Sequence, residues 1–233
     1  MALPLLVFDV NETLLDLDAL APHFERMFGD RAALREWFTQ VILYSEAITL
    51  SDNYAPFGEL GAAVLNMLAV SRRVRVGEED LQALNEAIAT MPPHPEVPGA
   101  LERLREAGFR LFTLTNNPKA TCARQLECAG LTSLFERQFS VDDGVHRYKP
   151  AREVYRVVEG SLEASPSDLC LIACHTWDIL GAAAAGWHTA FIARPGNAAL
   201  AVGGQALIAG GDLEIVAKDL IQGFAARLKI AND

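Results

Sequence analysis

The spacing of hydrophobic residues changes along the chain and divides it into regions. An apolar run near the N-terminus ends on an aspartate and predicts a buried first strand at Leu3–Asp9. From residue 17 to residue 90 the apolar positions recur only with helical spacing. Helices are expected in this region at Leu17–Phe28, Arg31–Leu50, Ala55–Arg72 and Glu78–Met91. The four prolines of "MPPHPEVPG" then break the pattern and indicate a linker.

From Ala100 onward, helical spacing alternates with short apolar runs. Strands are expected in "FRLFTLTNN", "FERQFSVDD", "DLCLIAC" and "HTAFIAR", and a short strand near Leu213–Val216 is expected before a last helix. The intervening helices are expected at Ala100–Ala107, Lys119–Ala129, Ala151–Leu162 and Trp177–Ala185. This alternation predicts a parallel sheet with helices on both faces, and continuous runs such as "LCLIAC" fit strands that are buried on both sides.

These patterns together predict an α/β protein that carries an insert. The expected fold class is a Rossmann-like parallel sheet core with an all-helical cap inserted after the first strand. The core should comprise residues 1–14 and 97–233, and the cap residues 15–96. One apolar cap segment, "PFGELGAAVLNMLAV", could serve a dimer interface or the core of the cap. We favour the cap core, and a homodimer stays open.

Charge and composition exclude several classes of partner. The 233 residues are 51% hydrophobic and 21% charged, as in an ordinary globular protein, and the net charge is −10. We therefore expect neither a nucleic-acid partner nor a membrane partner, because both attract basic patches. No apolar run reaches the roughly 18 residues of a membrane helix, and no signal peptide is expected at the N-terminus. The four cysteines form no C-x-x-C pair, which favours reduced thiols and a cytoplasmic location.

Reactive side chains occur where the expected strands end. In open parallel sheets, ligands bind beyond the carboxyl ends of the strands. Those positions carry a carboxylate, a hydroxyl, an amide, an ammonium group and a second carboxylate, at Asp9, Thr115, Asn116, Lys149 and Asp178. Each residue by itself has an ordinary explanation as a cap or a turn residue. Their combination at one edge of one sheet predicts an active site.

Four segments in this order, "FDVNETLLD", "LTNN", "YKP" followed by "VY", and "HTWDILGAAAAG", resemble the haloacid dehalogenase superfamily. The segments are more similar to those of its type II (S)-2-haloacid dehalogenases than to those of its phosphatases. The resemblance implies that Asp9 is a nucleophile that forms an ester, with Thr13 holding its carboxylate and Lys149 pairing with it. A small anionic organic substrate is expected to contact Asn11, Glu12, Thr115, Asn116, Tyr155 and Trp177, and, from the cap, Phe38 and Arg35.

Asn11 selects between two reactions. Phosphatases of this superfamily carry an aspartate two positions after the nucleophile, where it protonates the leaving alkoxide. Loss of a general acid costs roughly 10²–10⁴-fold in rate. An asparagine cannot act as that acid, whereas a departing halide needs no proton. Asn11 therefore disfavours a phosphatase and is compatible with attack at a carbon–halogen bond.

The last motif points away from a metal. Superfamily phosphatases typically carry Gly-Asp-x-x-x-Asp there to hold Mg²⁺, whereas the corresponding stretch here is "ACHTWD". Cys174 occupies the first acidic position, and thiol and imidazole groups are poor Mg²⁺ ligands. We expect no metal and no cofactor. Asp178 then either orients Lys149 or activates water for hydrolysis of the ester.

Three positions depart from the dehalogenase pattern. Glu12 stands in a segment where an aromatic residue and a glycine are usual. Phe38 stands where type II enzymes carry a cap arginine for the substrate, so Arg35, about one helical turn away, could substitute or could be an ordinary solvated charge. His175 could be a plain strand-end histidine or could pair with Glu12 to activate the hydrolytic water.

The leading hypothesis is hydrolytic dehalogenation of a small 2-haloalkanoic acid through an aspartyl ester on Asp9. The alternative enzyme is a Mg²⁺-dependent phosphatase of the same superfamily. A third alternative is a catalytically altered binding protein that retained the fold, because the departures lie in the expected pocket. Retention of Asp9, Thr13, Lys149 and Asp178 together favours an enzyme.

Overall fold

The computed structural model describes residues 3–230. Its centre is a six-stranded, fully parallel sheet with the strand order β3-β2-β1-β4-β5-β6. The strands are β1 Leu5–Phe8, β2 Arg110–Thr115, β3 Arg137–Ser140, β4 Leu169–Ala173, β5 His188–Ile192 and β6 Ile208–Gly210. The expected α/β class with a parallel sheet is confirmed.

The first strand lies in the middle of the sheet. Val7 on β1 pairs with Phe112 on β2 and with Leu171 on β4. The chain therefore winds outward from β1 in both directions, which makes the β1–β4 boundary a topological switch point. A crevice opens at such a point beyond the carboxyl ends of the strands.

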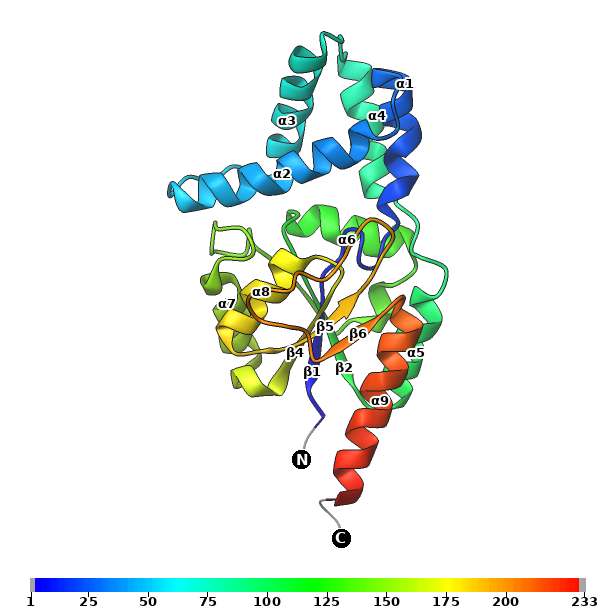
Figure 1. The fold of residues 1–233 in the computed structure, drawn as a ribbon, viewed down its shortest axis with the longest axis vertical. Coiled ribbons are helices and arrows are strands. Elements are labelled where there is room, and N and C mark those ends of the chain that lie inside the picture. Colours follow the sequence, from blue (N-terminus) through cyan, green and yellow to red (C-terminus); the bar gives the residue numbers. More distant parts are fainter. Residues whose placement is uncertain (1–2, 231–233) are drawn as a thin grey trace.

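Helices cover both faces of the sheet (Figure 1). Helices α5 (Val97–Glu106) and α9 (Leu213–Ile230) pack against each other on one face. Helices α7 (Arg152–Leu162) and α8 (Thr176–Ala185) pack together on the other face. The central strands β1 and β4 are wholly apolar, and all five residues of β4 are buried, as expected for strands covered on both sides.

Two local predictions were wrong. The segment near Leu213–Val216 is not a strand but the start of α9, because Leu213, Val216 and Leu220 are buried with helical spacing and Asp212 accepts the Ile215 backbone N–H at 2.8 Å. The strand of this region, β6, ends before it, at Gly210. The helix expected from Ala100 begins at Val97, because a proline in the first turn of a helix lacks only an N–H that would be unpaired there.

Between β1 and α5 the regular elements are all helices joined by loops. This segment contains a 3₁₀ turn at Leu17–Leu20, α1 (Ala21–Phe28), α2 (Ala33–Leu50), α3 (Phe57–Arg72) and α4 (Glu78–Ala89). Pro22 lies in the first turn of α1, so the single helix expected at Leu17–Phe28 is divided in two. These helices stand over the carboxyl end of the sheet (Figure 1), and we call them the insert. The division into two domains at residues 14/15 and 96/97 stays a prediction.

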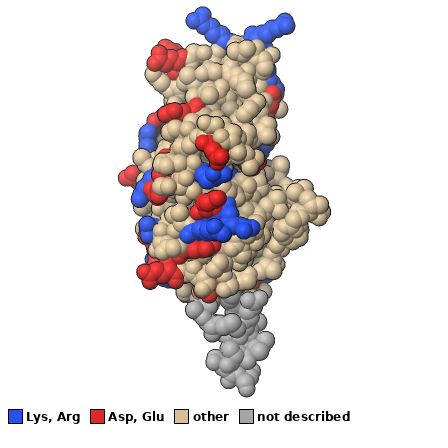
Figure 2. Space-filling view, turned by 90° about the vertical axis from the view of Figure 1, so that its left-hand side faces the viewer, with Lys and Arg blue, Asp and Glu red and all other residues tan. Residues whose placement is uncertain are grey.

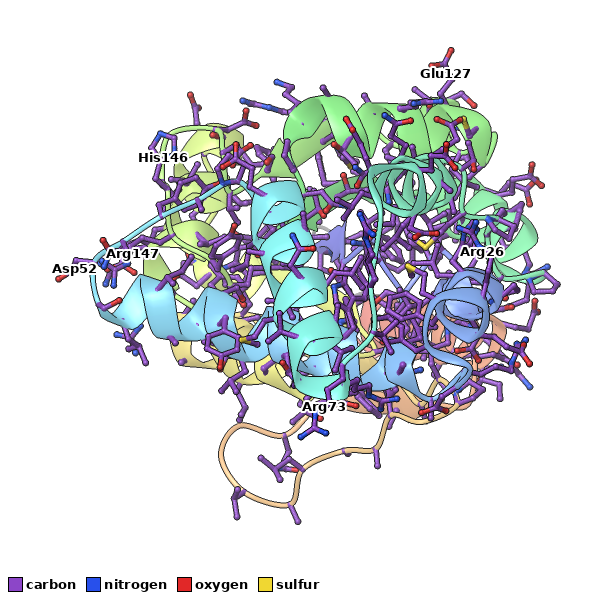
Figure 3. The ribbon with its side chains drawn as sticks, turned by 90° about the horizontal axis from the view of Figure 1, so that it is seen from above. Arg26, Asp52, Arg73, Glu127, His146 and Arg147 are labelled. Carbon is purple, nitrogen blue, oxygen red and sulfur yellow. The ribbon has the colours of Figure 1, made fainter. Side chains whose placement is uncertain are left out.

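Polar contacts hold the insert on the core. The segments that enter and leave it run side by side, since Leu15 pairs with Pro93 in an antiparallel bridge. At the far end of α2, Arg147 of the core forms a 2.9 Å ion pair with Asp52, and Figure 3 shows the two side chains together at the edge of the molecule. Helix α6 (Lys119–Cys128) contacts α4. The insert therefore closes over the edge of the sheet that carries the strand ends.

Charge is mixed on the face drawn in Figure 2, where acidic and basic side chains lie interspersed and large areas are uncharged. Within residues 3–230, every helix falls short of the length and apolarity that a membrane crossing needs.

Candidate active site

The carboxylate of Asp9 is the centre of the site. It follows β1 directly and is almost completely buried. Its Oδ1 accepts a hydrogen bond from Lys149 Nζ at 2.8 Å. Its Oδ2 accepts one from the Thr13 hydroxyl at 2.6 Å and lies 3.0 Å from His175 Nδ1. The expected roles of Thr13 and Lys149 as contacts of Asp9 therefore agree with the geometry.

Lys149 is anchored by core residues alone. Its ammonium group is fully buried and also donates to Asp178 Oδ2 at 2.6 Å and to the Leu114 carbonyl at 3.0 Å. Tyr155 donates to the other Asp178 oxygen at 2.6 Å. Burial alone would lower the pKa of Lys149, but Asp178 and Asp9 outweigh it and raise the pKa. This arrangement holds a fixed positive charge beside Asp9.

Tyr155 was expected to contact substrate, but the structure places it behind Asp178, fully buried. The sequence analysis also missed Gly181 on α8, which lies directly against Tyr155. A Cβ at Gly181 would collide with the tyrosine ring and with Pro150. The glycine therefore lets Tyr155 reach Asp178.

His175 contacts Asp9 from the opposite direction. Its ring lies between Trp177, stacked at 4.8 Å between ring centroids, and Phe38, tilted at 5.6 Å. Its Nε2 lies 2.9 Å from Glu12 Oε2. Both ring nitrogens therefore face carboxylates, which fits an imidazolium. Burial would lower the pKa of His175, but the Cys174 sulfur and the two carboxylates raise it well above its usual value.

Glu12 connects this histidine to the insert. Its backbone is in the left-handed region, with φ of 63°, and its carboxylate also pairs with Arg35 of α2. Burial raises the pKa of Glu12, but His175 and then Arg35 lower it overall. Arg35 was expected near the substrate. The structure instead places it on Glu12, with 37% of its side chain exposed.

These neighbours keep Asp9 ionised. Burial raises the pKa of its carboxyl group, but the charge of Lys149 and the hydrogen bond and charge of His175 outweigh it, so the pKa lies below the usual range. In contrast, burial raises the pKa of Asp178. An anionic Asp9 is the form that can act as a nucleophile.

A small chamber lies above Asp9. The insert contributes Phe38, Ile42 and Phe57 to it, and the remaining walls are Asp9, Asn11, Thr115, Asn116, His175 and Trp177. The Oδ1 of Asn116 accepts the Lys149 backbone N–H at 3.1 Å, while its buried Nδ2 has no hydrogen-bond partner among the described residues. The chamber thus offers a free amide donor close to the nucleophile. Ile42 and Phe57 were not predicted, because nothing in an apolar helix marks which residue faces a site.

Comparisons with known proteins agree with this geometry. Residues 3–186 match the family model described as haloacid dehalogenase-like hydrolase. The (S)-2-haloacid dehalogenase 1 of Pseudomonas sp. (strain CBS-3) is 30% identical to this chain, over 81% of this chain and 83% of that relative. The chain belongs to the haloacid dehalogenase-like hydrolases.

Two further similarities lie within the same family. The haloacetate dehalogenase H-2 of Moraxella sp. (strain B) is 28% identical, over 83% of this chain and 87% of that relative. A solved L-2-haloacid dehalogenase matches with a TM-score of 0.88 and 26% identity, over 97% of this chain and 100% of that chain. The resemblance found in the sequence is therefore confirmed.

Asn11 stands where phosphatases of this superfamily carry a general acid. Its Oδ1 accepts hydrogen bonds from Gln125 Nε2 at 3.0 Å and from Asn117 Nδ2 at 3.3 Å. Gln125 also donates to the Ile88 carbonyl of α4 at 2.9 Å. The side chain of Asn11 is thus fixed at the edge of the chamber by an amide network that the sequence analysis did not predict.

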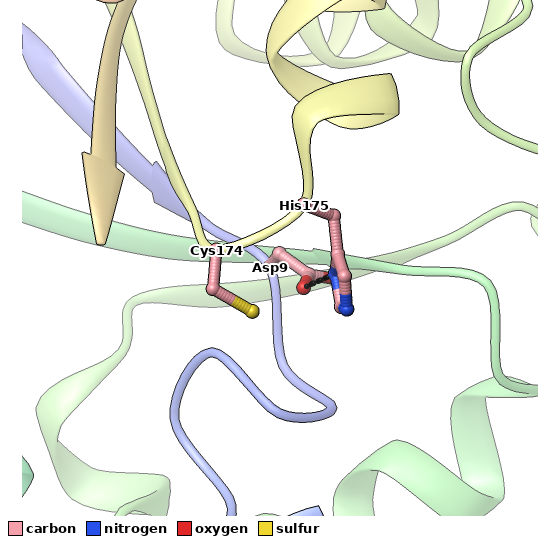
Figure 4. Close-up of side chains that lie close together, drawn as sticks. All are labelled: Asp9, Cys174 and His175. Carbon is pink, nitrogen blue, oxygen red and sulfur yellow. Dashed lines mark hydrogen bonds and ion pairs between the residues drawn. The ribbon is translucent and has the colours of Figure 1, made fainter. Parts of the chain in front are cut away.

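Because phosphatases of this superfamily bind Mg²⁺, the chemistry of the candidate ligands beside Asp9 decides whether that ion fits here. The side chains of Asp9, Cys174 and His175 lie close together (Figure 4), and one ligand atom of each lies within 4.8 Å of the others. Mg²⁺ prefers oxygen ligands. Here the cluster offers a thiol and a ring whose nitrogens both face carboxylates, and each Asp9 oxygen already contacts a donor. These residues do not fit Mg²⁺.

Proposed function

We propose that this protein hydrolyses the carbon–halogen bond of a 2-haloalkanoic acid and releases halide and the 2-hydroxy acid. The observation that carries the proposal is the anionic Asp9, held by Lys149 and His175 at the floor of a largely apolar chamber. The names of the curated relatives support the same reaction class.

In the first step, an Asp9 oxygen attacks C2 of the substrate. The new carbon–oxygen bond makes an ester, and the carbon–halogen electron pair leaves as halide. The free Asn116 amide can receive the substrate carboxylate, and the charge of Lys149 lies beside Asp9. Phe38 and Trp177 shield the reacting carbon from water. Because the halide leaves without a proton, the absence of a general acid at Asn11 does not slow this reaction.

In the second step, water attacks the carbonyl carbon of the ester. The bond between that carbon and the ester oxygen on C2 breaks, so this oxygen, which came from Asp9, leaves with the product and takes a proton to form the 2-hydroxy acid, while the oxygen from water completes the regenerated Asp9 carboxylate. Ester formation removes the negative charge that Asp9 presents to His175, so the pKa of the ring falls and the ring can lose its proton. His175 Nδ1 then lies in position to accept a proton from the attacking water.

The role of Asp178 follows from its contacts. Its two oxygens bind Lys149 and Tyr155, and the side chain is fully buried. Of the two roles considered for it, these contacts favour orientation of Lys149 over activation of water. Glu12 in turn holds His175 and offsets its charge, rather than contacting substrate.

The test is release of halide from the two enantiomers of 2-chloropropionate and from chloroacetate in the presence of EDTA. We expect turnover by the wild-type protein and none by Asp9→Asn. A single turnover in ¹⁸O-water with enzyme in excess should place the label in Asp9 and not in the product. If the folded wild-type protein releases no halide from any of these substrates, the proposal fails. EDTA-sensitive hydrolysis of p-nitrophenyl phosphate would instead favour the phosphatase alternative.

A further inference from the structure

A second cavity lies beside the chamber, between the insert and the core. Its volume is about 360 Å³, and its walls come mainly from α2, α3, α4 and α6. It shares three lining residues with the chamber above Asp9, namely Asn11, Phe38 and Phe57. The two spaces are therefore neighbours across these side chains.

The lining of this second cavity is predominantly apolar. Deep positions are taken by Leu17, Leu20, Trp37, Val41, Leu84 and Met91. The charged side chain among the lining residues, all of which the structure describes, is Arg124. It is 52% exposed and forms a 2.6 Å ion pair with Glu86 across the insert–core boundary. The uncharged polar lining residues are Asn11, Asn85, Asn117 and Thr121, and the rest of the wall is apolar apart from Arg124, so a hydrocarbon would lose contact with water there.

The cavity is partly open to solvent and is large enough to hold a small organic molecule. Pockets that bind small organic molecules span roughly 300–1,000 Å³, a range that includes this one. One wall is held in place because Trp37 donates to the Gly61 carbonyl at 2.9 Å, and a Cβ added at Gly61 would lie only 3.3 Å from the Trp37 ring.

We propose that this cavity binds the apolar substituent on C2 of the substrate, so that the enzyme prefers 2-haloacids with a long alkyl or an aryl substituent to 2-halopropionate. This inference rests on the proposed dehalogenation, because it needs the carboxylate and C2 to be held at Asp9 and Asn116. The substituent then passes Asn11, Phe38 and Phe57 into the cavity. Each buried methylene is expected to raise kcat/KM about fourfold until the cavity is filled.

The first experiment compares halide release from 2-bromopropionate, 2-bromohexanoate and 2-bromooctanoate. We expect kcat/KM to rise with chain length. In Ala62→Leu a larger side chain enters the cavity from α3, so the ratio of long-chain to short-chain kcat/KM should fall at least tenfold. Ala63→Leu is the matched control, because Ala63 is the next residue of the same helix, is exposed and does not line the cavity. Its ratio should equal that of the wild type.

A binding measurement separates this inference from the proposed reaction. Calorimetric titration with octanoate and with acetate needs no turnover, and octanoate should bind more tightly to the wild type and to Ala63→Leu than to Ala62→Leu. If 2-bromopropionate is turned over but longer chains bring no gain and Ala62→Leu leaves the ratio unchanged, the inference is overturned while the dehalogenation stands. If octanoate binds in this cavity-dependent way but no haloacid releases halide, the cavity assignment holds and the proposed reaction fails.

Discussion

Asp9 is held by two arrangements of charge that differ in burial and origin. On one side, which we call the lysine side, Lys149, Asp178 and Tyr155 form a cluster built from the core alone, and all three are fully buried. On the other side, which we call the histidine side, the contacts run from His175 through Glu12 to Arg35. Arg35 belongs to the insert and is 37% exposed.

This difference assigns different tasks to the two sides. The charged groups of the lysine side are fully buried and are hydrogen-bonded to one another and to the core backbone. They therefore keep a single arrangement and supply a constant electric field at Asp9. The histidine side ends at solvent and at a helix of the insert, so it responds to pH, to salt and to the position of the insert. Mutations on the lysine side should therefore cost both stability and rate under all conditions, whereas the effects of those on the histidine side should depend on pH or salt.

The largest effect is expected from Lys149→Met. The variant leaves Asp9 and Asp178 buried without their shared cation, which should cost about 3–5 kcal/mol of unfolding free energy. Halide release should fall roughly 10³-fold or more, because the positive charge beside the nucleophile is gone. Urea unfolding and halide release measure the two effects. Lys119→Met, at a side chain that is 63% exposed, is the control and should change neither. A folded Lys149→Met enzyme with wild-type stability would contradict the claim that the lysine side stabilises the fold.

An intermediate effect is expected from His175→Gln, which keeps a hydrogen-bonding group but removes the titrating ring. Halide release should fall roughly 10²-fold, as for loss of a proton-transfer group. The pKa of His175 is raised in the folded protein, so its ion pairs stabilise fully below its ordinary pKa of 6.5. That stabilisation is lost as the pH rises through the folded-state pKa. The stability difference from wild type should therefore be larger at pH 6 than at high pH.

Glu12→Gln tests the same side without touching the ring. Removing one carboxylate lowers the pKa of His175. The variant should therefore lose the stabilisation from His175 at a lower pH than the wild type does. Urea unfolding of Glu12→Gln and of Glu12→Gln/His175→Gln across pH measures that shift. An unchanged pH dependence would show that Glu12 does not act through His175.

The same division explains what the sequence could predict. The lysine side lies at strand ends whose meeting point follows from parallel topology, so Asp9, Lys149 and Asp178 could be placed together before any coordinates. The Glu12–His175 contact was proposed from the adjacency of their strands and is present. The partner of Arg35 was not predicted, because the angle between an inserted helix and the core depends on packing that no local pattern encodes. For the same reason Ile42 and Phe57, both on the insert, were missed.

The smallest effect is expected from Arg35→Met, at the exposed end of the histidine side. An ion pair that is one-third open to solvent contributes about 0.2–1 kcal/mol, so the variant should lose no more than about fivefold in halide release. The loss should shrink in 1 M salt, where the screening length falls to roughly 3 Å. Arg31→Met is the matched control, since Arg31 precedes the same helix, is 58% exposed and pairs with Glu25 instead of Glu12. A large, salt-independent loss in Arg35→Met, absent from Arg31→Met, would mean that Arg35 contacts the substrate itself, and the histidine side would then be part of the binding site.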